Sequence, residues 1–393
     1  MSHPPLRVGL VGARFAANLH LHAYRRVYGV PVEIVGVTSR SAESRERFAS
    51  ENGLRAFDSL ESLIEAVDVL DVCAPPDTHV PCAVAALEAD KHVIIEKPLT
   101  GAFGSGEGFD GWKAAKEPLL EEAMEGCRRL VEAEAKSRGT VGYAENWVYA
   151  PAIQKEAEVL RKSGGHILWL HGCEAHSGSH SPTYGIWARS GGGSIVGKGC
   201  HPLTAALYLK RVEGLARDGR AIRPQTVSAR AHRITALDSF RDLGHLRKDY
   251  DDVEDMGSLH VTFDDGTVAD IFSNELTLGG VHNWLSVFAD NHRAHCHLNP
   301  NDSLEMYNPK EEYLEDVYVV EKIGTKQGWS RPSPDEDWFH GFPHEIRGFL
   351  TAFQNGETPE SDLPLGVDTV AVMYAGYVSI ERRGQEVDVP NLV

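Results

Sequence analysis

The chain opens with a stretch that restricts its fold, RVGLVGARFAANLH, which runs from Arg7 to His20. It begins as a buried strand, reaches Gly12 and continues as a helix. A dinucleotide-binding unit begins in this way, because its pyrophosphate lies against backbone N–H groups at a helix N-terminus. Gly12 and Ala17 occupy the first and third positions of G-x-G-x-x-G/A, and Arg14 stands at the second. We expect Arg14 to turn aside or to contact phosphate, with Phe15 beside it in the same cofactor-binding turn.

Strand and helix patterns alternate over the first part of the chain. This order predicts a doubly wound parallel sheet with helices on both faces, a Rossmann arrangement. A glycine-rich insertion, residues 101–118, interrupts the rhythm and is either a surface loop or a flap over a ligand. The expected strands are 6–11, 32–38, 69–74, 92–96 and 140–145, and the expected helices are 15–27, 42–52, 59–66, 79–89 and 117–137.

The pattern changes after about residue 150. Longer strands with period-two alternation predict an α+β domain with a large open, mainly antiparallel sheet. The Asp-Gly pair in TFDDGTV predicts a hairpin. We therefore predict a dinucleotide-binding domain over 1–146 and a substrate-binding domain over 147–393 that also carries oligomer contacts. Its expected strands are 166–175, 225–235, 257–265, 267–276 and 284–290, and the closing helices are 343–356 and 366–384.

Composition excludes several classes of partner. The formal charge is −18, from 39 basic and 57 acidic residues, so neither nucleic acid nor an anionic membrane is expected as a partner. The six cysteines form no C-x-x-C pair, which is typical of a reduced, cytoplasmic protein. We expect no signal peptide and no apolar run that approaches the length of about 20 residues needed to cross a bilayer.

The end of the second predicted strand bears on the choice of cofactor. A carboxylate there would accept a hydrogen bond from the ribose 2′-hydroxyl of NAD. The chain has TSRS instead, and Ser39 with Arg40 can surround a 2′-phosphate, which favours NADP. NAD stays open, because Arg40 can also stack on the adenine or remain solvated.

Two later stretches, with the opening one, identify a family resemblance. One has a proline after a strand, His79 at a helix start, and then Glu96-Lys97-Pro98; the other is SGGGSIVGKGCHPLTAALYL. Together they resemble the glucose–fructose oxidoreductase, inositol dehydrogenase and MocA family over most of the chain. The resemblance implies an NAD(P)-dependent dehydrogenase that acts on a secondary alcohol of a sugar, polyol or glycoside. We also expect a homo-oligomer, dimer or tetramer, because an open sheet with one apolar face favours burial against a partner subunit.

The same resemblance implies roles for particular residues. Gly12 and Ala17 would hold the pyrophosphate, and Ser39 with Arg40 would face the adenosine ribose. His201 would match the catalytic histidine of the family. The remaining cofactor contacts would come from Pro75, His79, Glu96, Lys97 and Pro98.

The chain departs from the family at two positions beside His201. The family often has an aspartate four residues before the histidine and another three residues after it, but Gly197 and Thr204 stand there. We therefore expect His201 to lack its usual carboxylate partner. Lys198 is an added cation beside the site.

The chemistry of alcohol oxidation agrees with these assignments. A group must take the hydroxyl proton as the hydride leaves, and histidine suits that proton at neutral pH. A lysine beside the same oxygen stabilises developing alkoxide charge. We predict Lys97 and His201 as the catalytic residues.

Two clusters combine aromatic faces with hydrogen-bonding groups, as sugar sites do. One lies in YAENWVYAP and the other in GCEAHSGSHSPTYGIW. A rival interpretation is a metal site from Glu174, His176, His180 and His201, which the spacing does not favour. We predict no metal, and substrate contacts from Glu145, Asn146, Trp147, His176, His180, Tyr184, Trp187 and Lys198.

Two other functions stay open at this stage. The cofactor can oxidise a sugar transiently so that a neighbouring bond is eliminated, which would make the protein a glycosidase or lyase. Alternatively, the protein is a non-catalytic NAD(P)-binding regulator, and the absent carboxylates at Gly197 and Thr204 are the only support for that alternative.

Overall fold

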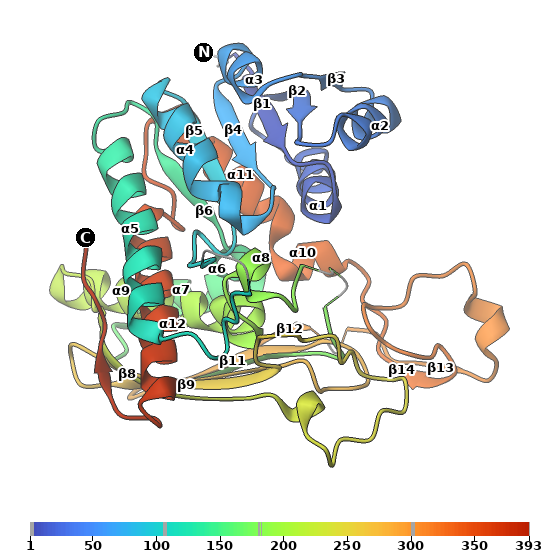
Figure 1. Cartoon of the computed structure of the whole chain (residues 1–393), viewed down its shortest axis with the longest axis vertical. Coiled ribbons are helices and arrows are strands. Elements are labelled where there is room, and N and C mark those ends of the chain that lie inside the picture. Colours follow the sequence, from blue (N-terminus) through green and yellow to red (C-terminus); the bar gives the residue numbers. More distant parts are fainter. Residues whose placement is uncertain (1–3, 105–107, 180, 182, 300–302, 393) are drawn as a thin grey trace.

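The computed structural model describes residues 4–104, 108–179, 181, 183–299 and 303–392. Two sheets organise these residues (Figure 1). The N-terminal sheet and its helices form one half of the molecule, and the second sheet lies beneath a layer of helices in the other half.

The first sheet has six strands in the order β3-β2-β1-β4-β5-β6, and all its neighbouring pairs are parallel. This is the predicted doubly wound sheet. Its strands are β1 (Leu6–Val11), β2 (Val32–Thr38), β3 (Arg55–Ala56), β4 (Val69–Val72), β5 (His92–Glu96) and β6 (Val141–Ala144). The connecting helices are α1 (Phe15–Tyr24), α2 (Ala42–Asn52), α3 (Leu60–Ala66), α4 (His79–Glu88) and α5 (Lys116–Glu134), with a short turn η1 (Pro76–Thr78) before α4.

Local signals explain where these elements begin and end. Ser41 caps α2 by accepting from the Ser44 N–H, and Gly53 ends the same helix in the left-handed conformation. The core strands β1, β4, β5 and β6 are buried on both faces, so they read as continuous apolar runs rather than alternating ones. Strand β3 was not predicted, because two residues are too short to give a pattern.

The second sheet has seven strands in the order β12-β11-β7-β10-β9-β8-β15. It is mainly antiparallel as predicted, and the TFDDGTV hairpin joins β9 to β10. The pair of β7 with β10 is parallel, so the carboxyl ends of these two strands meet at one edge. The strands are β7 (Ile167–Ala175), β8 (Pro224–His232), β9 (Met256–Phe263), β10 (Val268–Asn274), β11 (His282–Ala289), β12 (Arg293–Asn299) and β15 (Val387–Asp388).

Helices cover one face of this sheet (Figure 1). A small two-stranded sheet extends away from the body of the molecule. The helical segments are α6 (Asn146–Tyr149), α7 (Pro151–Ser163), α8 (Trp187–Ser190), η2 (Ile195–Gly199), α9 (Cys200–Asp218), η3 (Ile234–Ala236), η4 (Glu311–Leu314), α10 (Glu336–His340), α11 (Phe342–Asn355) and α12 (Leu363–Glu381). The small sheet consists of β13 (Met306–Asn308) and β14 (Gly328–Ser330).

The last two long helices join the halves of the molecule. α11 packs on α1 and α6, while α12 packs on α5, α9 and β8. Gly142 of β6 leaves room for Phe349 of α11, since a Cβ at Gly142 would lie 2.6 Å from that ring. The predicted domain boundary after residue 146 falls inside α6 and stays a prediction.

The glycine-rich insertion is tied to the second half of the chain, apart from residues 105–107, which lie outside the described residues. The Ala102 N–H donates to the Tyr374 hydroxyl, and the Trp187 indole donates to the Ala102 carbonyl. The Gly111 N–H donates to Asp252. The insertion thus connects the two halves, so motion as a flap would require these bonds to break.

Helix α12 corrects one expectation. It is long and apolar enough, by length and composition, to cross a membrane, whereas we expected no such segment. However, 83% of its apolar window is buried inside the protein. Packing in the core accounts for this apolarity, as in the central helix of many soluble proteins.

Candidate active site

Gly12 makes the turn from β1 into α1. Its φ is +115°, and a Cβ there would lie 2.6 Å from the Cys73 carbonyl oxygen, so only glycine fits. Ala17 is fully buried, and the side chains of Arg14 and Phe15 are exposed. The turn therefore fits a pyrophosphate at the start of α1, with Arg14 free to reach a phosphate.

Ser39 and Arg40 follow β2 at the same edge of the sheet. The Ser39 hydroxyl donates to the Ser41 carbonyl at 3.0 Å. Arg40 is 70% exposed and pairs with Asp77 of η1 at 2.8 Å. The guanidinium of Arg40 is therefore already paired with the Asp77 carboxylate, and a ribose phosphate would compete with this pair. The sequence pattern did not indicate this pairing.

His79 and Pro98, two of the predicted cofactor residues, contact each other. His79 is fully buried, and its ring nitrogens lie 2.9 Å from the carbonyl oxygens of Pro98 and Ala74. His79 therefore connects the loop after β4 to the segment after β5. Pro75 is exposed beside it, Pro98 is buried, and the Lys97–Pro98 peptide bond is cis. Their contact with a cofactor stays a prediction.

Glu96 is held by a buried network that sequence reasoning missed. His20 of α1 places Nδ1 2.9 Å from Asp71 and Nε2 3.1 Å from Glu96. Burial by itself lowers the pKa of His20, but the neighbouring Asp71 and Cys73 raise it well above its ordinary value. Both ring nitrogens thus donate to carboxylates. The other Glu96 oxygen accepts from the Lys97 N–H at 2.8 Å, which fixes the backbone beneath Lys97.

Lys97 reaches from the end of β5 to the second half of the chain. Its Nζ donates to the Gly197 carbonyl at 3.0 Å. Burial by itself lowers the pKa of Lys97, but Tyr184 and Cys200, ahead of Glu96 and Glu174, raise it above its ordinary value. Lys97 is therefore an ammonium at neutral pH, suited to stabilise negative charge on an oxygen rather than to accept a proton.

His201 lies one turn after Gly197, near the start of α9, and it does have a carboxylate partner. Its Nδ1 lies 2.5 Å from Oε1 of Glu145, which is fully buried at the end of β6. The expectation that His201 lacks such a partner was wrong, because a different strand supplies the acid. With Nδ1–H donated to Glu145, Nε2 is the nitrogen left to accept a proton.

Glu174 is the main residue that our predicted site omitted. It lies near the end of β7, 8% exposed, with Oε2 3.9 Å from Nε2 of His201. This oxygen is buried and has no hydrogen-bond partner among the described residues. Burial raises the pKa of Glu174, against the effect of His201, Lys97 and Lys198. A buried acceptor without a donor is costly, so a ligand hydroxyl is a natural partner.

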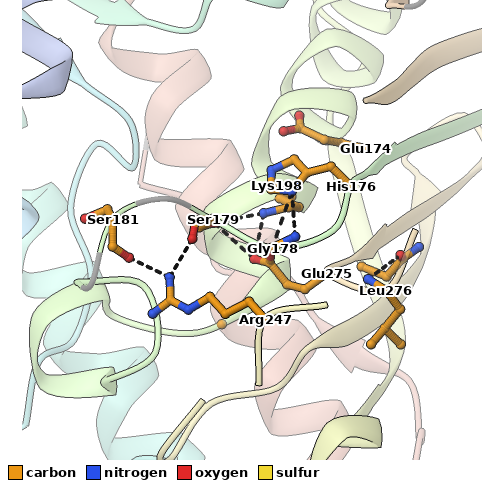
Figure 2. A network of polar contacts seen from close by, with 12 residues as sticks. Glu174, His176, Gly178, Ser179, Ser181, Lys198, Arg247, Glu275 and Leu276 are labelled. Carbon is orange, nitrogen blue, oxygen red and sulfur yellow. Dashed lines mark hydrogen bonds and ion pairs between the residues drawn. The ribbon is translucent and has the colours of Figure 1, made fainter. Parts of the chain in front are cut away.

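Lys198 is part of a second network, shown in Figure 2. It is 2% exposed, and its Nζ donates to Glu275 at 2.6 Å and to the Ser179 hydroxyl at 3.0 Å. Arg247 donates to the carbonyls of Ser179 and Ser181, so Ser179 is held by Arg247 as well as by Lys198. Glu275 directly follows the end of β10. Because β10 is parallel to β7, the segments after both strands lie at the same edge of the sheet, where Glu275 contacts Ser179.

The other predicted substrate residues differ in how far they are buried. Trp147 is buried and stacks behind His201, with ring centroids 6.1 Å apart. Asn146 donates to the His340 carbonyl, and Trp187 is fully buried beneath the insertion. Their contact with a substrate stays a prediction. His176 is buried and accepts from the Gly178 N–H. Tyr184 is half-buried beside Lys97, and His180 lies outside the described residues.

Among the described residues, Glu174, His176 and His201 of the rival metal set do not form a group of three close enough to hold an ion, and His180 lies outside those residues. The three groups whose ligand atoms lie close enough to hold an ion are His20–Asp71–Cys73, Glu145–Cys200–His201 and His166–Glu213–Asp265. In the first two, hydrogen bonds between histidine and carboxylate already occupy the atoms that would bind the ion.

Glu254 anchors the segment that carries Lys198 and His201. Its carboxylate accepts from the N–H groups of Gly193 and Ile195 and from the Tyr377 hydroxyl. Burial raises the pKa of Glu254 from 4.5 to about 7, against the effect of these donors.

This raised pKa predicts a pH dependence of stability. A carboxyl that binds its proton more tightly when folded stabilises the fold below its unfolded pKa and loses that contribution as the pH rises through its folded pKa. We expect the free energy of unfolding to fall by about 3 kcal/mol between pH ~4.5 and ~7 from this group. Urea unfolding of Glu254→Gln should show a smaller decrease over this range than the parent; equal decreases would contradict the assignment.

Comparison with known proteins bears first on the dinucleotide-binding half of the chain. Residues 6–118 match the family described as "Oxidoreductase family, NAD-binding Rossmann fold" (GFO_IDH_MocA). A UDP-N-acetylglucosamine 3-dehydrogenase of Acidithiobacillus ferrooxidans is 32% identical over 95 residues, 24% of this chain and 29% of that protein. A D-glucoside 3-dehydrogenase of Escherichia coli is 26% identical over 215 residues, 53% of this chain and 55% of that protein. The chain thus spans less than two thirds of the length of these relatives.

Solved structures extend the similarity of fold to the whole chain. GenD2 from gentamicin A biosynthesis, solved in complex with NAD, has a TM-score of 0.78 at 22% identity, covering 100% of this chain and 98% of that one. A myo-inositol 2-dehydrogenase from Lactobacillus plantarum has a TM-score of 0.69 at 16% identity, covering 98% and 100% of the two chains.

The first sheet, with its Gly12 turn, has the NAD-binding Rossmann fold that the match over residues 6–118 describes. A second, mainly antiparallel sheet follows it in the chain. Over residues 6–118 the chain is therefore similar to the glucose–fructose oxidoreductase, inositol dehydrogenase and MocA family.

Proposed function

We propose that the protein is an NAD(P)-dependent dehydrogenase that transfers a hydride between the nicotinamide and a secondary alcohol of a sugar, polyol or glycoside. The observation that carries the proposal is the meeting of Lys97 and His201. Lys97 extends from the dinucleotide-binding sheet to the turn that precedes His201, where it donates to Gly197. An ammonium and an imidazole with a free Nε2 thus lie at one place beside the cofactor domain.

The residues divide the work according to their charge. A bound nicotinamide supplies the hydride acceptor. Nε2 of His201 takes the hydroxyl proton, and Glu145 stabilises the imidazolium that results, since its carboxylate holds Nδ1. The ammonium of Lys97 stabilises the negative charge that develops on the substrate oxygen. Glu174 accepts from a further substrate hydroxyl through its unpartnered oxygen.

The regulator hypothesis loses its support at this site. It depended on the absent carboxylates at Gly197 and Thr204. Glu145 supplies a carboxylate to His201 from another strand, and Thr204 instead bonds the Thr369 hydroxyl in the core. Relatives named as sugar 3-dehydrogenases favour catalysis on a ring hydroxyl.

A substrate screen tests the function directly. Purified protein is incubated with a panel of sugars, polyols and glycosides, each with NAD and with NADP, and reduction is followed at the nicotinamide absorbance. We expect net reduction with at least one member. A cofactor that stays bound with no net reduction, while a glycoside is cleaved, would instead favour the glycosidase or lyase hypothesis.

For the cofactor, we propose NADP ahead of NAD, on the hydroxyl of Ser39 and the guanidinium of Arg40. Ser39→Asp should shift the ratio of the specificity constants toward NAD, because a carboxylate repels the 2′-phosphate and accepts from a free 2′-hydroxyl. Ser50→Asp is a matched control, since Ser50 is exposed on α2 and adds the same charge away from the β2 end. Equal ratios in both variants would show that Ser39 does not face the ribose.

We also propose a cytoplasmic homo-oligomer, a dimer or tetramer, assembled through the uncovered face of the second sheet. Leu168 and Phe272 are 49% and 37% exposed there. The His171 ring contacts both Phe272 and Trp169, which extends this surface along the sheet. Contiguous apolar surface on an open sheet favours burial against a second copy. Light scattering of Phe272→Asp should give a smaller mass than the parent.

A further inference from the structure

The ring of Tyr184 fills the space beside Gly197. A Cβ at Gly197 would lie 3.2 Å from both Cδ1 and Cε1 of Tyr184. Carbon atoms pack at about 3.5–4.0 Å, so a side chain at residue 197 would require the ring to move by a few tenths of an ångström. Tyr184 comes from the loop between β7 and α8, whereas Gly197 lies in η2.

Lys97 contacts both residues. Its Nζ donates to the Gly197 carbonyl at 3.0 Å and lies 5.5 Å from the centroid of the Tyr184 ring. A cation within about 6 Å of an aromatic centroid is attracted by the ring quadrupole. The ammonium thus contacts a carbonyl dipole and Tyr184, whose ring it faces and whose hydroxyl is also its hydrogen-bond partner.

The carboxylate of Glu145 hydrogen-bonds to His201 rather than to Lys97, on which Glu96 and Glu174 act through their charge. Glu145 lies 2.5 Å from Nδ1 of His201. Burial raises the pKa of Tyr184, against the effect of the nearby Lys97, so the phenol is neutral at neutral pH. The carboxylate therefore strengthens the proton acceptor, while the charge of Lys97 remains available to a substrate oxygen.

We propose that Tyr184 is a positioning residue, whose ring holds the Lys97 ammonium against the Gly197 carbonyl without cancelling its charge. Gly197 is then the residue that makes room for the ring. The inference depends on the proposed function for its kinetic effect, but the contact between Tyr184 and Gly197 can be tested without any substrate.

The kinetic test separates the aromatic ring from the space that it fills. Tyr184→Phe keeps the ring, and Tyr184→Leu fills much of the volume without it. With the best substrate of the panel, we expect Tyr184→Phe to stay within about threefold of the parent, and Tyr184→Leu to lose about tenfold in kcat. The KM for the cofactor should change little in either variant. Equal losses in both variants, or no loss in Tyr184→Leu, would overturn the inference.

The second test uses melting temperature and needs no activity. In the parent, Gly197→Ala should lower the melting temperature, because the added Cβ meets the ring. In a Tyr184→Ala background the same change should raise it, since alanine is favoured over glycine in a helical segment. The same sign in both backgrounds would overturn the inference. If no substrate emerges from the panel, the proposed function fails while this cycle still decides whether the ring and residue 197 compete.

Discussion

Replacement of His201 by alanine should slow turnover by about 10²–10⁴-fold, the usual cost of losing a positioned proton acceptor. Cofactor affinity should be almost unchanged, because Nε2 faces Glu174 and the substrate side rather than the Gly12 turn. The measurement is kcat for the best substrate of the panel, together with cofactor binding by fluorescence titration.

Glu145→Gln provides the matched test of the partner. The amide can still hold the ring, but it removes the negative charge that stabilises the imidazolium, so we expect an intermediate loss of kcat. A Glu145→Gln variant with parental kcat would show that the 2.5 Å contact has no catalytic role. Parental kcat in His201→Ala would falsify the assignment of the proton acceptor.

Removal of the Lys97 ammonium should have a comparable effect. Lys97→Ala deletes the positive charge nearest the substrate oxygen, and losing one such electrostatic contact costs about 10²–10³-fold in kcat. Lys113→Ala is the control, since the Lys113 side chain is 79% exposed and forms a surface salt bridge with Asp110. We expect parental rates from this control.

The two losses should not multiply. Lys97 and His201 act on the same oxygen and its proton, and groups that work as a unit are strongly non-additive. The double variant should therefore be slower than either single variant by less than the product of their effects. A full product would indicate that the two residues serve separate steps, contrary to their meeting at Gly197.

Much of the first sheet could be predicted from the sequence because its signals are local. β1, β2 and β5 have the predicted bounds, and α2 spans the predicted residues 42–52. Buried parallel strands are mostly apolar, and Ser41 and Gly53 cap the two ends of the helix that lies between them. Short or polar elements such as β3 and β12 carry no comparable pattern.

The site was harder to predict, because its partners are distant in sequence. Lys97 and His201 stand in recognisable motifs, but Glu145 is 56 residues from His201. Glu174 was visible as an acid near a strand end, yet nothing local marked it as facing His201. Trp147 and Trp187, predicted as substrate contacts from their aromatic faces, are both buried, which no local pattern in the sequence indicated.

The sequence by itself determined the dinucleotide-binding turn, the parallel strand–helix alternation and the two motifs that carry Lys97 and His201. These features depend on residue type and spacing, since a turn at positive φ needs Gly12 and a buried strand needs apolar runs. The tertiary structure alone decided the charges around the reacting groups. It placed Glu145 on His201, a neutral ring on Lys97 and Glu275 on Lys198. Such pairings arise when separate strands end at a common edge, and no local pattern encodes that proximity.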